Sequence, residues 1–246
     1  DGTGCNRLPL PAFVINLSYS GPGMSSILRA VACIVLASIL GACATGDPAV
    51  RTNHRALVVT PVTLGEAWIS AESLADTPDS IAVTVDADGR RIAWVTAKSG
   101  HRLVGHDVDT GAVVRTLGGE GTAPGQFLRP NGVAAAGGLL WTVETNGARA
   151  QIIDPADGQA LAVFGAGEVA LPYGIAVETL AEGHYLAYIT DSDQANGEAA
   201  PPAAALARRV HVYEVRIADG ATPDIRPRTT FGATDGPGAL HMVESI

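Results

Sequence analysis

Lysine is almost absent from this chain of 246 residues, and Lys98 is the only one. The 16 Lys and Arg residues are outnumbered by 25 Asp and Glu residues, which gives a formal net charge of −9 at pH 7. Binding to a nucleic-acid backbone relies on clustered Lys and Arg, so the charge argues against that class of protein. An acidic chain that holds phosphate groups needs a local basic pocket or a bound cation.

Other expected signatures are missing as well. The sequence has no G-x-S-x-G, no G-x-x-x-x-G-K and no H-E-x-x-H motif, so it offers no nucleophile elbow, P-loop or zinc-protease helix. Beyond the first 42 residues no segment sustains a helical period, which leaves no crossover helices for a parallel sheet. Apolar residues make up 47% of the chain, so a core is available.

The N-terminal region is typical of an export signal. A short segment from Met24 carries Arg29, the apolar run Ala30–Leu40 follows, and the run ends at Leu-Gly-Ala-Cys43. These last four residues resemble the lipobox of bacterial lipoproteins, which implies that Cys43 is lipidated and becomes the mature N-terminus. We therefore expect a lipid anchor in the cell envelope. Because Ala44 is not the Asp of an inner-membrane retention signal, the outer membrane is the expected destination.

This interpretation divides the chain into four parts. We expect upstream, non-native sequence at 1–23, a signal peptide at 24–42, a flexible tether at 43–57 and the folded domain at 58–246. Of the three cysteines, only Cys43 remains after cleavage, so the mature form has no intrachain disulfide.

The domain consists of short apolar runs separated by turn residues, and the pattern repeats. The equivalent starts lie at Ser80, Gly132, Gly174 and Ser245, and each preceding unit ends on an apolar residue followed by Gly. The spacing from Gly132 to Gly174 falls within the roughly 40–50 residues of a four-stranded propeller blade. The sequence thus predicts an all-β fold, a β-propeller of four-stranded antiparallel blades, with a β-sandwich as the alternative.

The number of repeats is small for a closed ring. We count about three blades and the first residues of a fourth, whereas a propeller has at least about four blades and often six. The expectation is an incomplete six-bladed ring whose last blades follow Ile246. The Ala/Pro-rich stretch from Asp191 to Arg209 is expected to be a loop.

Carboxylates lie near the ends of the expected inner strands, where a propeller builds its sites. They include Asp76, Asp79, Glu144 and Asp191, and the stretch that begins at Asp191 adds Asp193, Asn196 and Glu198. Such oxygens suit Ca²⁺, although a solvated loop is the simpler interpretation of the last cluster.

Two resemblances bear on function. Gln126, Phe127, Pro130, Gly132, Arg149 and Gln151 match the pattern of NHL-type propeller repeats. The order of the units from Ser70 to Ile246 also resembles the β-propeller phytases, six-bladed secreted enzymes that hydrolyse inositol phosphates with Ca²⁺. In that resemblance, Lys98 and Arg129 correspond to a Lys and an Arg of the family. The family's Asn-Asn-Val-Asp run is only half present here, and its later Lys is missing.

The phytase resemblance implies a calcium-dependent phosphomonoesterase. Lys98 and Arg129 would bind the phosphate of a substrate such as phytate, and Ca²⁺ held by Asp79, Glu144 and Asp191 would activate a water. The alternative is a non-catalytic cell-surface propeller that binds a protein or a glycan, since a fold does not determine a function.

Overall fold

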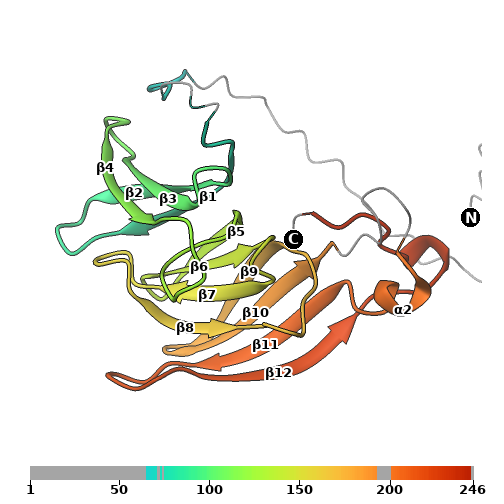
Figure 1. Cartoon of the computed structure of the whole chain (residues 1–246). Coiled ribbons are helices and arrows are strands. Elements are labelled where there is room, and N and C mark those ends of the chain that lie inside the picture. The colour runs from blue at the N-terminus through green and yellow to red at the C-terminus, as the bar shows by residue number, and fades with distance from the viewer. Residues whose placement is uncertain (1–64, 71–72, 74, 193–200, 245–246) are drawn as a thin grey trace, which may run out of the picture. The chain divides into compact units, whose positions relative to one another are not determined.

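The computed structural model describes residues 65–70, 73, 75–192 and 201–244. In this part of the chain, strands form three separate four-stranded antiparallel sheets, which we call blades 1 to 3 (Figure 1). The expectations for residues 1–57, Cys43 included, and for Asp193, Asn196 and Glu198 lie outside the described residues. Within the described residues, no helix is both long and apolar enough to span a membrane.

Each blade is a meander in which consecutive strands pair, so that strand order in the sheet follows the sequence. Blade 1 holds β1 (Pro78–Val85), β2 (Arg91–Ala97), β3 (Arg102–Asp107) and β4 (Val113–Gly118). Blade 2 holds β5 (Pro130–Ala136), β6 (Leu139–Glu144), β7 (Arg149–Ile153) and β8 (Ala160–Phe164). Blade 3 holds β9 (Pro172–Ala181), β10 (His184–Asp191), β11 (Val210–Arg216) and β12 (Asp224–Phe231).

Tight turns that the sequence marks with Asp and Gly connect these strands. In the β1–β2 turn the Asp86 carboxylate accepts the backbone N–H groups of Asp88 and Arg90, and Gly89 has φ of 79°. In the β3–β4 turn the Asp107 carboxylate accepts the backbone N–H groups of Asp109 and Thr110. Side-chain oxygens that bind nearby backbone in this way are the physical reason that Asp favours turns.

The blades lie face to face, with their first strands next to one another. β1 contacts β5, and β5 contacts β9, so the three first strands line one side of the array (Figure 1). At Gly132 the approach of β9 leaves no space for a side chain, because an added Cβ would lie 2.7 Å from Tyr173 O and 3.0 Å from Ile175 N. Gly132 is therefore needed where β5 and β9 meet.

Two apolar clusters fill the spaces between the blades. Between blades 1 and 2 the buried cluster includes Trp94, Leu103, Phe127 and Leu140. Between blades 2 and 3 it includes Trp141, Ile152, Ile189 and Tyr213. Side chains from both facing sheets contribute to each cluster, as expected when sheets stack through alternate residues.

The last described residues occupy the place of another inner strand. Thr96 Oγ1 in blade 1 donates to Asn131 O on the next inner strand at 2.8 Å, and Thr190 Oγ1 in blade 3 donates in the same way to Glu244 O at 3.0 Å. Ser192 Oγ likewise donates to Val243 O. This agrees with the repeat start that the sequence predicts near Ser245.

One expectation about the Ala/Pro-rich stretch is wrong in part. The structure forms a short helix, α2 (Ala203–Leu206), where the sequence predicted only a loop. Ala205 and Leu206 are buried in this turn, so its packing against the domain accounts for the ordered structure of an alanine-rich segment.

Candidate functional site

The second strands of blades 2 and 3 end on a buried carboxylate, and in blade 1 the same position holds an alanine. Strand register makes Ala97, Glu144 and Asp191 equivalent, because they pair with the prolines that open β1, β5 and β9. Two of the three predicted calcium ligands therefore have equivalent positions in neighbouring blades.

Glu144 is fully buried and surrounded by protein donors. Its Oε1 accepts hydrogen bonds from Arg149 Nε and Gln151 Nε2, both at 2.7 Å, and its Oε2 accepts one from Leu128 N at 2.7 Å. Arg149 also donates to Gln126 O at 2.9 Å in the segment that leads into β5. Glu144 thus links β6 and β7 to the segment between blades 1 and 2.

Asp191 has the corresponding role in blade 3. Its two carboxylate oxygens accept the backbone N–H groups of Ala170 at 2.8 Å and Leu171 at 2.9 Å, which lie just before β9. His211 Nε2 lies 3.5 Å from Asp191 Oδ2, and both side chains are buried. The carboxylate holds the segment between blades 2 and 3 in place.

The structure does not gather the three predicted calcium ligands into one group. Glu144 and Asp191 belong to different blades and accept hydrogen bonds from protein N–H groups, whereas Asp79 pairs with Lys98. Among the residues that the structure describes, no three His, Cys, Asp or Glu side chains come together as a metal ion would require. A shared site of Asp79, Glu144 and Asp191 therefore has no support in the geometry.

Lys98 follows directly after β2 and pairs with a carboxylate on the neighbouring strand. Its Nζ lies 3.3 Å from Asp79 Oδ1, and the two side chains are 16% and 27% exposed. Asp79 neutralises the lysine but leaves it reachable from solvent. The side chain predicted to bind phosphate is therefore slightly exposed, and its charge is already compensated by Asp79.

Arg129 lies between two blades in an unusual backbone conformation. Its φ is 59°, a left-handed value that non-glycine residues adopt with difficulty, and Pro130 follows it. Its N–H donates to His101 Nδ1 at 3.0 Å, and its carbonyl accepts from Thr145 N at 3.1 Å. These bonds fix the backbone of Arg129 between the β2–β3 turn of blade 1 and the β6–β7 turn of blade 2.

The guanidinium of Arg129 has no partner in this arrangement. Within the described residues it makes no hydrogen bond or ion pair, although the residue is partly buried. By contrast, the guanidiniums of Arg102 and Arg149 are paired with Asp76 and Glu144. An unpaired, partly buried arginine beside the turn that carries Lys98 is a place where an anion would be stabilised.

His101 joins this group, and the sequence did not single it out as a site residue. Because its Nδ1 accepts the Arg129 N–H, the proton of the neutral imidazole is on Nε2, which leaves that atom as a hydrogen-bond donor. We call the group of Asp79, Lys98, His101 and Arg129 the interblade corner. Lys98 follows the partner of Pro78 and Arg129 precedes Pro130, so the two residues lie at the same end of blades 1 and 2.

Comparisons with known proteins find only distant structural likeness. No family model matches the chain, and no curated protein matches it. Three similar solved structures are hydrazine synthase of Kuenenia stuttgartiensis, a streptogramin B lyase, and a catalytically inactive variant of virginiamycin B lyase from Staphylococcus aureus with quinupristin. Their identities to this chain are 15%, 16% and 14%, with TM-scores of 0.43, 0.40 and 0.40.

These matches are partial on both sides. They cover 66%, 65% and 64% of this chain but only 39%, 43% and 43% of the other chains. The chain therefore spans about two-fifths of the length of the structures that it matches. At such identities and TM-scores the likeness carries no argument about function, and the fold rests on strand pairing and on the contacts between first strands. The described part of the chain is an all-β array of three propeller-type blades.

Proposed function

We propose that this domain is a phytase-like propeller that binds a phosphomonoester, such as an inositol phosphate, at the interblade corner. The observation that carries the proposal is the guanidinium of Arg129, which has no partner among the described residues, in a residue whose backbone N–H binds His101 in the turn that carries Lys98. A phosphomonoester carries about 1.5 to 2 negative charges near neutral pH. Arg grips two phosphate oxygens in a fork, while Lys acts as a point charge.

The proposal also includes hydrolysis of the bound phosphomonoester, which depends on a cation. Ca²⁺ bound jointly by Asp79 and the phosphate oxygens of the substrate would neutralise charge and activate a water. The engagement of Glu144 and Asp191 by protein donors favours the second candidate, a propeller that binds its ligand without chemistry. Lipidation of Cys43, which would place either activity at the cell envelope, is part of the same proposal.

Calorimetric titration tests the binding. We expect myo-inositol hexakisphosphate to bind and unphosphorylated myo-inositol not to bind. Arg129→Ala should weaken the binding by about 10- to 100-fold, because the loss of a charge-assisted hydrogen bond costs about 1.5–3 kcal/mol. Lys98→Met should weaken it less, because Asp79 already compensates the ammonium. The matched control is Arg208→Ala, which removes the same charge from an exposed position in blade 3.

His101 variants separate positioning from contact. Asn at position 101 tolerates the left-handed backbone, φ of 52°, and its Oδ1 can still accept the Arg129 N–H. His101→Asn should therefore keep thermal stability but lose part of the ligand affinity if Nε2–H contacts phosphate. Equal affinity for His101→Asn and the parent protein would restrict His101 to positioning Arg129.

Phosphate release measured in the same samples decides between the two candidates. Release with Ca²⁺ that stops with chelator and falls in both Arg129→Ala and Lys98→Met supports the hydrolase. Binding without release supports the non-catalytic propeller. Failure of the phosphorylated ligand to bind in a folded protein would contradict a phosphate site at the interblade corner and favour a propeller that binds a protein or a glycan.

A further inference from the structure

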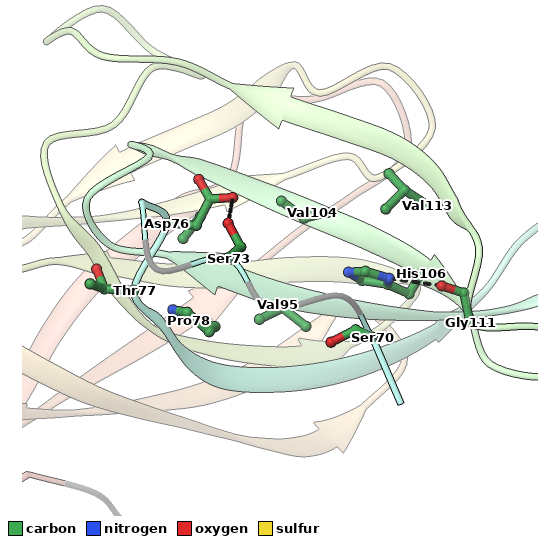
Figure 2. A pocket seen from close by; sticks show the side chains of 11 residues that line it. Ser70, Ser73, Asp76, Thr77, Pro78, Val95, Val104, His106, Gly111 and Val113 are labelled. Carbon is green, nitrogen blue, oxygen red and sulfur yellow. Dashed lines mark hydrogen bonds between the residues drawn. The ribbon is translucent and has the colours of Figure 1, made fainter. Parts of the chain in front are cut away.

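A separate cavity lies on the face of blade 1 that points away from blade 2. This open cavity has a volume of about 660 Å³, within the roughly 300–1,000 Å³ typical of small-molecule sites. Figure 2 shows Val95, Val104 and Val113 of the sheet on one side and Ser70 and Ser73 of the preceding segment on the other. We call it the strap pocket, because Ser70, Ser73 and Asp76, which precede β1, line it as well.

The segment over the pocket is attached at both ends. Near its start, Trp68 Nε1 donates to Val108 O at 2.7 Å, and the indole stacks on His106 with ring centroids 6.1 Å apart. Near its end, Asp76 accepts from Ser73 Oγ at 2.7 Å and pairs with Arg102 at 2.7 Å. These two attachments keep the described part of the segment above the sheet, so the space below it is maintained.

The charged group of the pocket is already compensated. The Ser73 hydroxyl and the Arg102 guanidinium hold the pKa of Asp76 below its ordinary value, so the carboxylate is ionised and paired. The remaining lining is mainly apolar, with three valines, Pro78 and Ala97, and its polar groups include the Ser70 and Thr77 hydroxyls. A ligand for this pocket is therefore mainly apolar and carries no net charge.

His106 adds one directional polar group. Its Nδ1 lies 3.1 Å from Gly111 O, and a carbonyl can only accept, so in the neutral ring the proton is on Nδ1 and Nε2 is an acceptor. Figure 2 shows this second nitrogen on the side of the ring away from Gly111, toward the middle of the pocket. Its tautomer is opposite to that of His101.

We propose that the strap pocket binds a neutral, largely apolar molecule that carries a hydroxyl group, which donates a hydrogen bond to His106 Nε2. The valines of β2, β3 and β4 contact the apolar body. This site lies outside the interblade corner, and the inference does not depend on the function proposed for that corner.

The test uses 1-naphthol as the probe and naphthalene as its analogue without the hydroxyl, with binding followed by fluorescence. The protein should bind 1-naphthol saturably and naphthalene about tenfold more weakly, as expected for one net hydrogen bond. His106→Phe keeps a ring beside Trp68 but removes the acceptor, so it should bring both probes to the same affinity. Val113→Trp should block both, whereas Val163→Trp, at another exposed site in blade 2, should block neither.

Three results would overturn the proposal. The first is absence of 1-naphthol binding in a folded, monomeric protein. The second is an unchanged preference for 1-naphthol over naphthalene in His106→Phe. The third is sedimentation that shows a second copy covering this face of blade 1, since the pocket would then be part of an interface between chains.

Discussion

Glu144→Ala should lower the free energy of unfolding by about 3–5 kcal/mol, the cost of removing one partner from a buried ion pair. The substitution leaves the Arg149 guanidinium without its counter-charge and removes the acceptor of Gln151 Nε2 and Leu128 N. The effect should extend across the contact between blades 1 and 2, because Leu128 belongs to the segment that joins them. Denaturant unfolding followed by circular dichroism measures it.

The control for this substitution is Glu182→Ala, at an exposed carboxylate in the β9–β10 turn, which should change stability by less than about 0.5 kcal/mol. The destabilisation of Glu144→Ala should be the same with Ca²⁺ and with chelator. A loss of stability that appears only when Ca²⁺ is present would instead make Glu144 a metal ligand. It would contradict the inference that Glu144 links β6 and β7 to the segment between blades 1 and 2.

Gly132→Val should destabilise the domain by about 2–3 kcal/mol or more, because the new side chain has no space. An added Cβ would lie 2.7 Å from Tyr173 O, 3.0 Å from Ile175 N and 3.1 Å from Gly174 Cα, all backbone atoms of β9. Backbone cannot rotate away as a flexible side chain can, so β5 and β9 must separate. The free energy of unfolding measures this effect.

Ser80→Val is the matched control for this close approach. Ser80 has the equivalent position in β1, and only its backbone N–H is needed for the hydrogen bond to Thr96 Oγ1. We expect a change of less than about 1 kcal/mol there. Equal destabilisation at the two positions would mean that the contact between inner strands is not the cause.

The blade architecture could be predicted because its signals are local. Asp86 and Gly89 mark one hairpin, Asp107 marks the next, and the alternation between them places apolar side chains on the buried faces. The starts of the first strands were predicted less accurately. β1, β5 and β9 begin at Pro78, Pro130 and Pro172, two residues before the repeat starts that the sequence marks. A break in the strand register just after each proline hides those residues from an alternation pattern.

The candidate site was predicted less well, because its contacts join distant residues. Because Glu144 lies near the end of a strand, the sequence suggested that it is a metal ligand. In the structure its carboxylate instead binds Arg149 and Gln151, which come from the next strand. That pairing had a usable signal, since both partners belong to the Arg-x-Gln element of the NHL-type pattern. His101 had none. Its bond to Arg129 depends on the left-handed backbone at both residues, which no local pattern marks.

The most direct measurement of the central claim is the NMR signal of the Arg129 Nε–H during titration with myo-inositol hexakisphosphate. An unpaired guanidinium that gains a phosphate should show a saturable change of that signal, with the affinity found by calorimetry. The Arg149 Nε–H, which is bound to Glu144, should change little. Saturable ligand binding that leaves the Arg129 signal unmoved would contradict the assignment of the interblade corner as the phosphate site.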